Sequence, residues 1–296
     1  MAVIDTRVFL DKVPAPPPEE IEAAVKNLRE WLEKEPHLPR IDDDEWLKTF
    51  FYNNKFSLKK TKSKIENYYS LRNKYPNMLK NRDPRAPWIA DYLPYMSISS
   101  KLTADGARLF LIKYNLDMDK FDVDKYFKCM TMTQDLLMLE KDRLTSYLLL
   151  IDLQNFTYQH FIRICTRLKA AVEIFEKAYT ERIEAVYLFN TPSITDLAIR
   201  TFLPLFPVKY ADRVFVNTAS NNKFLERFHE KDLPSDLGGK GASWAEGAEW
   251  LHQKALQYTE WFLEQDNITS NERLRRKEDK QQPGDLIGSF RKLEVD

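Results

Sequence analysis

The residues that could form a nucleophilic site are few in this sequence. His160 and Cys165 stand five positions apart in a predicted helix, and this spacing places them on different faces of that helix. A cysteine–histidine pair brought together by the fold, with Asp152 as third member, is one interpretation; a packed, inert cysteine is the other. Asp152 ends an apolar stretch, where α/β proteins place functional acids, but a carboxylate there also orients a neighbouring loop. These three residues define a hydrolase hypothesis.

Sequence motifs of the common enzyme classes are absent. The chain contains no G-x-S-x-G, H-E-x-x-H or G-x-x-x-x-G-K-[ST] pattern. Its one glycine cluster, residues 238–241, fits neither nucleotide-binding fingerprint and indicates a turn, with a phosphate loop as the alternative. The four histidines lack a second histidine or a cysteine at a metal-ligand spacing: His37, His160, His229 and His252. We therefore expect a protein that is not an enzyme and has no metal or cofactor.

An unusually apolar helix is predicted at residues 194–203, continuing as an apolar segment to 206. Two apolar stripes run along it: Ile194, Ala198, Phe202 and Leu205, and Ile199, Leu203 and Phe206. A helix that is apolar over most of its circumference must be covered on more than one side. Pro204 lacks an amide hydrogen and breaks the helix near its end. The pattern fits either a lid over an apolar cavity or an ordinary buried helix.

The elements around this helix alternate between strands and helices. The first ninety residues read as helices, at 19–34, from 42 onward and at 57–74. Strands are predicted at 107–113, 146–153, 183–190 and 213–216, and helices at 123–140, 158–179, 194–203, 221–228 and 244–280. Such alternation is typical of a mostly parallel sheet flanked by helices. The fold class is therefore α/β, with a helical subdomain at 1–94, a sheet domain at 95–242 and a helical tail at 243–296.

Composition excludes several classes of protein. The 296 residues carry 45 basic and 45 acidic side chains, so there is no overall positive field to attract nucleic acid. Two cysteines cannot build a disulfide framework and suit a reducing compartment. The first ten residues do not read as a signal peptide, and the apolar run at 147–151 is too short to span a bilayer. We expect a cytoplasmic protein.

Charge is nevertheless distributed unevenly along the chain. Residues 19–45 hold ten acids and four bases, whereas residues 55–85 hold ten bases and two acids. A basic patch of this kind attracts anionic lipid headgroups, with about 1 kcal/mol per base near a charged surface. The alternative is a solvated helix face that pairs in part with the acidic segment.

Five segments in order resemble the CRAL-TRIO family of lipid carriers, and look most like its arthropod tocopherol-transfer-like and retinaldehyde-binding-like members. They are Asp43–Leu47 with Phe50–Leu58, Tyr68–Arg72 with Tyr75 and Pro76, Leu150–Leu153, Leu188–Pro192, and Leu233–Gly239. The resemblance implies a CRAL-TRIO-N helical subdomain before a CRAL-TRIO lipid-binding domain, with residues 195–206 as a mobile gate helix. It implies binding and intermembrane transfer of a small hydrophobic ligand, such as a retinoid, tocopherol, carotenoid or terpenoid.

The resemblance also implies which residues form the binding sites. The pocket would be lined by Phe156, Phe161, Cys165, Phe175, Tyr187, Phe189, Ile194, Leu197, Phe202 and Leu203. Some relatives also hold a phosphoinositide beside the gate, at positions that correspond to Lys209, Arg213 and Lys223. Tyr52 stands where those relatives carry an arginine, and tyrosine supplies neither a permanent charge nor a bidentate fork. Transient membrane association is expected, and the alternative function is a phosphoinositide-binding membrane adaptor or sensor.

Overall fold

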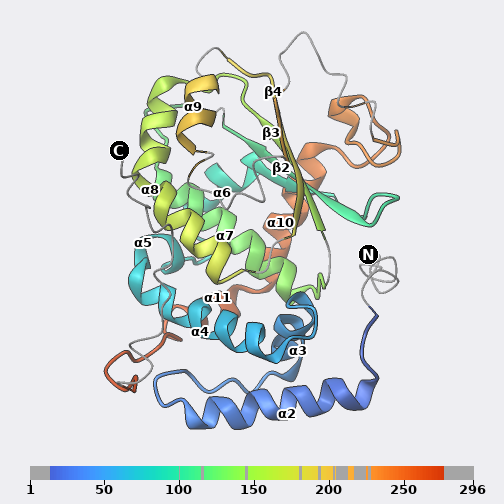
Figure 1. Cartoon of the computed structure of the whole chain (residues 1–296). Helices are drawn as coiled ribbons and strands as arrows, with labels where there is room; N and C mark the ends of the chain where they lie inside the picture. Colours follow the sequence, from blue (N-terminus) through green and yellow to red (C-terminus); the bar gives the residue numbers. More distant parts are fainter. Residues whose placement is uncertain are drawn as a thin grey trace, which may run out of the picture.

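The structure is a computed structural model of the whole chain (Figure 1). It describes residues 14–99, 101–114, 117–143, 146–179, 182–192, 195–202, 204, 213–216, 225 and 228–276. Every structural statement below concerns these residues.

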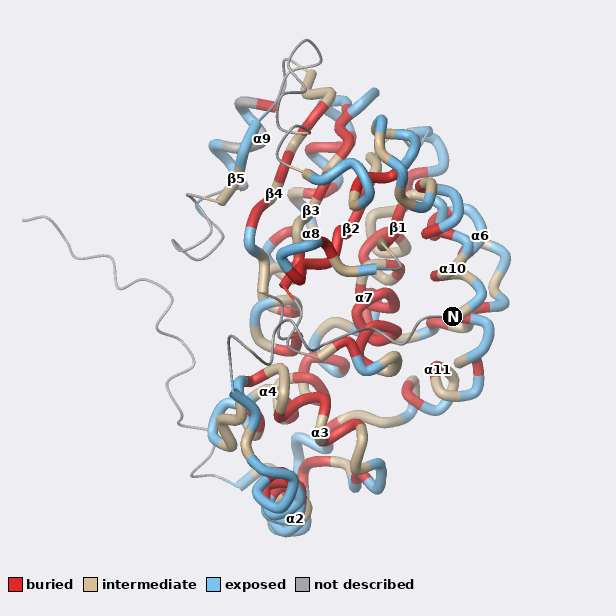
Figure 2. The backbone as a smooth tube through the Cα atoms, turned by 90° about the vertical axis from the view of Figure 1, so that its right-hand side faces the viewer, coloured by how far each residue is buried: buried red, intermediate tan, exposed pale blue. Residues whose placement is uncertain are grey.

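The first part of the chain is helical, as predicted. Its helices are α2 (Pro18–Lys34), α3 (Asp44–Asn53), α4 (Leu58–Lys74), α5 (Pro76–Leu79) and α6 (Pro87–Tyr92). Asp43 begins α3 as its N-cap, because its carboxylate accepts hydrogen bonds from the amides of Glu45 (2.8 Å) and Trp46 (3.1 Å). Ser57 caps α4 in the same way, and α4 ends before Pro76. Figure 2 shows α2 at the base of the molecule, with one side buried and the other exposed.

A five-stranded sheet follows, with its strands in sequence order. β1 (Met96–Ile98) pairs antiparallel with β2 (Ala107–Lys113). β3 (Ser146–Asp152), β4 (Ile183–Phe189) and β5 (Val214–Val216) then add in parallel. The sheet is therefore mostly parallel, which confirms the predicted fold class.

Three crossover helices cover one face of this sheet. They are α7 (Val123–Leu139), α8 (Tyr158–Lys177) and α9 (Thr195–Phe202). Because connections between neighbouring parallel strands are right-handed, strands in sequence order place all such helices on the same side. Figure 1 shows α7, α8 and α9 together on one side of the strands. The opposite face meets the start of α10 (Trp244–Gln257) and the loop that carries Leu233.

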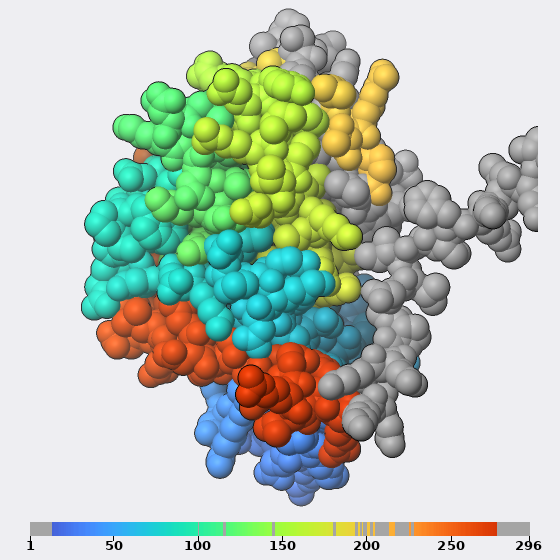
Figure 3. Space-filling view, turned by 90° about the vertical axis from the view of Figure 1, so that its left-hand side faces the viewer, coloured from blue at the N-terminus to red at the C-terminus, as the bar shows by residue number. Residues whose placement is uncertain are grey.

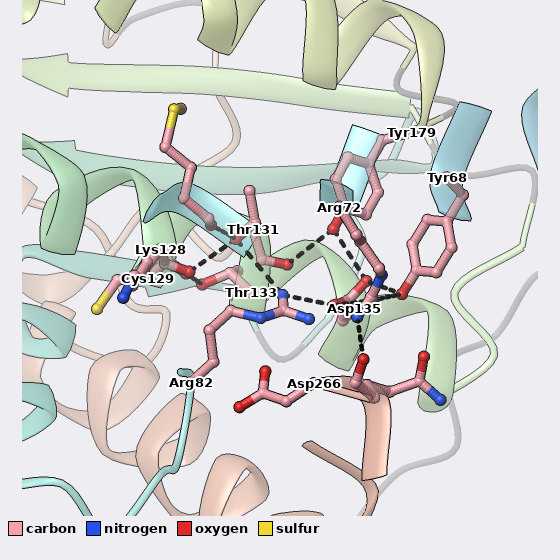
Figure 4. A network of polar contacts seen from close by, with 12 residues as sticks. Tyr68, Arg72, Arg82, Lys128, Cys129, Thr131, Thr133, Asp135, Tyr179 and Asp266 are labelled. Atoms are coloured by element: carbon pink, nitrogen blue, oxygen red, sulfur yellow. Dashed lines mark hydrogen bonds and ion pairs between the residues drawn. The ribbon is translucent and has the colours of Figure 1, made fainter. Parts of the chain in front are cut away.

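A buried charge cluster joins the helical front to the sheet domain (Figure 4). We call Tyr68, Arg72, Arg82, Asp135 and Tyr179 the Asp135 cluster. The Asp135 carboxylate on α7 pairs with Arg82 at 2.7 Å and accepts hydrogen bonds from Tyr68 (2.8 Å) and Tyr179 (3.0 Å). Arg72 on α4 donates to the Tyr68 hydroxyl at 2.5 Å and to the Gln265 carbonyl at 3.0 Å. Four separate stretches of chain thus meet at one carboxylate.

The end of the described chain lies against the helical front. Beyond α10 and α11 (Thr259–Gln265), Ser270 accepts a hydrogen bond from Asn73 at 2.5 Å, and Asn271 donates to the His37 carbonyl at 2.7 Å. Arg275 pairs with Glu66 on α4. The C-terminal segment therefore packs across α2 and α4.

The structure differs from the prediction in the C-terminal helix and in short elements that were not predicted, which are α5, α6 and β1. The helix predicted at 244–280 is interrupted at Tyr258 and ends at Gln265, because the following residues bond to the helical front instead of continuing the helix. Strand β1 was missed, since three residues give no readable alternation. The helix predicted at 221–228 falls largely outside the described residues.

Candidate functional site

The helix-covered face of the sheet is only partly covered. Register places Phe110, Ile112, Leu149, Ile151, Val186 and Leu188 on this face. Phe110 and Ile112 on β2 are buried, whereas the last four of these residues, on β3 and β4, are half-buried. We call Leu149, Ile151, Val186 and Leu188 the apolar strip. Strands with a neighbour on both sides ordinarily bury such residues fully, so the helices leave the strip incompletely covered.

The facing helix α8 carries most of the predicted pocket residues that lie on this side. Phe161 is buried, and Cys165 and Phe175 are half-buried; all three pack on the same core as the strip. Phe156, in the loop before α8, is buried between Tyr114 (ring centroids 5.7 Å apart) and His160 (5.8 Å). The structure therefore groups these four residues beside the apolar strip.

Tyr187 and Phe189 lie on the other face of the sheet, which corrects the predicted pocket. Both pack with Leu150 and Trp244, and the Tyr187 ring stacks on Phe215 at 5.2 Å. Successive side chains of a strand point to opposite faces, so the β4 residues that face α8 are Val186 and Leu188. The alternation of side chains along β4 can be read from the sequence, but which alternate set faces α8 follows only from the pairing of strands in the sheet.

Helix α9 forms where the apolar gate was predicted. Leu197 is 46% exposed, whereas Thr195, at the first position of the helix, is 3% exposed. The side chain of Phe202, and residues Ile194 and Leu203, lie outside the described part. Figure 3 shows α9 beside α8 on one face of the molecule.

The carboxyl edge of the sheet holds the turn that leads into α9. The Asp152 carboxylate accepts hydrogen bonds from the Asn190 side-chain amide and from the Gln154 backbone amide, both at 2.9 Å. Asn190 has a left-handed backbone (φ 52°), which asparagine tolerates better than most residues. Asp152 thus orients the turn before α9, as the loop-orienting interpretation predicted.

The local geometry gives no support to the hydrolase hypothesis. The Nδ1 atom of His160 is 2.8 Å from the Thr157 hydroxyl and accepts from the Thr157 amide at 3.1 Å, which completes the N-cap of α8. Burial raises the pKa of the Cys165 thiol, the opposite of what an activated thiolate needs. Among the described residues, no group of three or more histidine, cysteine, aspartate or glutamate residues is arranged to hold a metal ion.

Part of the basic stretch at 55–85 is used inside the fold, whereas Lys55, Lys59, Lys60 and Arg85 stay exposed. Arg72 and Arg82 are buried. Lys64 donates to the carbonyls of Glu176, in the last turn of α8, and Tyr179, just after it (2.6 Å to Tyr179), and Lys74 pairs with Glu173 at 2.7 Å. These bases pair mainly with α8 and α7, not with the acidic segment.

Of the three predicted phosphoinositide-binding residues, the structure describes only Arg213. Lys209 and Lys223 lie outside the described residues. Arg213 donates to the Ile183 carbonyl at 2.6 Å. Tyr52, at the position of the expected arginine, packs under the Arg143 guanidinium, whose carbon lies 4.9 Å from the ring centre.

A separate recess of about 540 Å³ lies on the outer side of α10. Its lining is Glu246, Glu249, Trp250, Gln253, Lys254, Leu256 and Gln257. None of these residues belongs to the apolar strip or to the predicted pocket. No helix in the described part of the chain is both long and apolar enough to cross a membrane.

Comparison with known proteins places this geometry in a family. Residues 17–89 match the family described as "Pinta-like, UBA domain", and residues 96–239 match the family described as "CRAL/TRIO domain". The SEC14 cytosolic factor of Kluyveromyces lactis is 25% identical over 255 residues, which span 78% of this chain and 82% of that protein. Human clavesin-2 is 19% identical over 228 residues, which span 75% of this chain and 70% of that protein.

Among solved structures, that of Sfh5 aligns with a TM-score of 0.48 and 14% identity, over 85% of this chain and 96% of that chain. The sheet with its covering helices coincides with the match at 96–239. Residues 96–239 therefore form a domain of the CRAL/TRIO family, whose members include lipid-binding and lipid-transfer proteins.

Proposed function

We propose that this protein binds one small hydrophobic ligand between the helix-covered face of the sheet and helices α8 and α9, and transfers it between membranes. The observation that carries the proposal is the apolar strip, which stays half-buried on two inner strands. Apolar area removed from water contributes about 25 cal/mol per Å². A ligand that covers the strip from above would therefore gain affinity without any polar contact.

Two leucines on β3 provide a direct test. Leu149 lies in the apolar strip, and its neighbour Leu148, also half-buried, lies on the opposite face. We expect Leu149→Trp to fill the binding space and to reduce both lipid co-purified with the protein and the uptake of added retinol or α-tocopherol. Leu148→Trp should leave both unchanged.

The readouts are mass spectrometry of extracted lipid and fluorescence titration of delipidated protein. Equal ligand binding by Leu149→Trp and Leu148→Trp would show that the apolar strip is not part of the binding site. Absence of lipid from the wild-type protein, with no uptake of any apolar compound offered, would refute the function.

We propose that the ligand is exchanged at a membrane through the carboxyl edge of the sheet. Three large apolar side chains are exposed there, Tyr158 (56%) and Ile162 (43%) on α8 and Leu197 (46%) on α9. Both helices begin at this edge, because each follows the carboxyl end of a parallel strand. An apolar group beside the predicted gate is suited to enter the headgroup region of a bilayer.

A matched pair of variants tests the membrane contact. Leu197→Glu should weaken binding to phosphatidylcholine vesicles and slow ligand transfer, whereas Leu274→Glu, at a 51% exposed leucine in the C-terminal segment, should not. Vesicles that also contain a phosphoinositide distinguish the adaptor alternative. Binding that depends on the phosphoinositide and not on Leu197 would favour the adaptor over the carrier.

A further inference from the structure

One buried threonine differs from all the others that the structure describes. Seven threonines are buried, and six of them use their hydroxyl in a hydrogen bond. These six are Thr49, Thr61, Thr103, Thr131, Thr133 and Thr259. The seventh, Thr195, is 3% exposed, and its hydroxyl has no partner. An unpaired polar group in such a place is ordinarily selected against, because burying it removes its hydrogen bonds to water without replacing them.

The position of Thr195 explains why the chain supplies no partner. Buried threonines inside a helix, such as Thr61 and Thr133, donate to the carbonyl four residues earlier. Thr195 is the first residue of α9, so the carbonyl four positions earlier belongs to the turn and not to a helix. Its amide is already used, in a 3.0 Å hydrogen bond to the Pro192 carbonyl. Only the hydroxyl remains available.

The surroundings of Thr195 are those of a ligand site. It follows the carboxyl end of β4, and ligands of open α/β sheets bind outside the carboxyl ends of the strands. The first turn of a helix also presents amides without intrahelical partners, with a partial positive charge. A hydroxyl and a helix N-terminus together favour an oxygen atom over a hydrocarbon end.

We propose that the Thr195 hydroxyl binds the single polar end group of the ligand, a hydroxyl or carbonyl oxygen, at the start of the gate helix. The inference rests on the proposed carrier function and narrows its ligand to an apolar lipid that ends in one oxygen. The apolar strip then covers the hydrocarbon part, and Thr195 sets which end of the molecule lies at the gate.

Paired compounds that differ by one hydroxyl test the proposal. Delipidated wild-type protein, Thr195→Val, Thr195→Ser and Thr201→Val are titrated with farnesol and farnesene, and with octadecanol and octadecane. Thr201→Val is the matched control, since Thr201 is exposed on the same helix. We expect the wild type to prefer each alcohol about two- to twelvefold, the gain from one hydrogen bond. Thr195→Val should lose this preference while keeping its affinity for the hydrocarbon, and the other two variants should keep the preference.

A second readout needs no ligand. Valine replaces the unpaired hydroxyl with a methyl group of similar size, so Thr195→Val should raise the melting temperature of the delipidated protein by about 2–12 °C. A lower melting temperature would mean that water or a protein group already pairs the hydroxyl, which would overturn the proposal.

The outcomes separate this inference from the carrier function. If the wild type binds alcohol and hydrocarbon equally, or if Thr195→Val keeps the preference, the Thr195 proposal is wrong and the carrier function stands. If the wild type binds neither member of either pair, nor retinol or tocopherol, both fail together.

Discussion

Removing the carboxylate of Asp135 should destabilise the whole protein. Asp135 is fully buried and faces two buried arginines, at 2.7 Å to Arg82 and 3.7 Å to Arg72. Asp135→Ala leaves both guanidinium groups without a counter-charge and the Tyr68 hydroxyl without its acceptor, and it leaves the Tyr179 hydroxyl with only a 3.4 Å contact to the Thr131 carbonyl. Breaking a buried pair from one side costs about 3–5 kcal/mol. For a chain of this size that lowers the melting temperature by about 6–20 °C.

The assay is thermal unfolding followed by circular dichroism, with urea unfolding as a second measure of the free energy. Arg40→Ala is the matched control, because Arg40 and Asp42 also lie 2.7 Å apart but are 86% and 68% exposed. Exposed pairs are screened by water and contribute little, so the control should unfold like the wild type. A loss below about 1 kcal/mol for Asp135→Ala, or equal effects of the two variants, would refute the argument that burial governs the strength of this cluster.

Three further predictions concern other parts of the fold. Burial alone would raise the pKa of Glu173, but hydrogen bonds from Lys74, Tyr75 and Lys177 lower it to about 2. Its contribution to stability is therefore full above about pH 5 and lost as the pH falls towards 2, so Glu173→Gln should flatten that part of the melting-temperature profile. Gly247→Ala should destabilise by about 1–3 kcal/mol in urea unfolding, because the new methyl would lie 2.6 Å from the Ile98 carbonyl oxygen; an unchanged midpoint would contradict this contact. Asp152→Ala should cost about 1.5–3 kcal/mol and speed ligand transfer by freeing the turn before α9. Asp152→Asn, whose side-chain oxygen can still accept from the Asn190 amide, should transfer ligand at the wild-type rate; equal transfer rates for the two variants would argue against the role of that turn.

Periodicity predicted most helices and strands, but it could not predict which residues far apart in the sequence contact one another. The strand at 107–113 and the end of α4 before Pro76 have the predicted bounds, because alternation, a serine cap and a proline are local signals. The face of each strand residue depends on register with its neighbours. The family resemblance placed Tyr187 and Phe189 in the pocket, whereas Val186 and Leu188 lie on the face of the sheet that meets α8.

The same limit applied to charge. A run of lysines and arginines in one segment predicted a surface patch. Apart from Tyr68, the partners of Arg72 and Arg82 are distant in sequence. Asp135 on α7 is 53 positions from Arg82, and Gln265 on α11 is 193 positions from Arg72, so no local pattern revealed that both arginines are buried. The unpaired hydroxyl of Thr195 likewise became visible only when the bonds of the other buried threonines could be compared.

The two helices beside the proposed ligand are held very differently. Lys64 and Lys74 of α4, and Tyr75 just after α4, hydrogen-bond to the C-terminal half of α8 and to Tyr179. The described contacts of α9 with the rest of the protein are mainly with α8. In the proposed carrier, α8 would be the fixed wall of the site and α9 the wall that moves during exchange. Substitutions on the fixed wall would change which molecule fits, and substitutions on α9 would change how fast it leaves. Ligand selectivity and the rate of ligand release would then change independently of each other among related carriers.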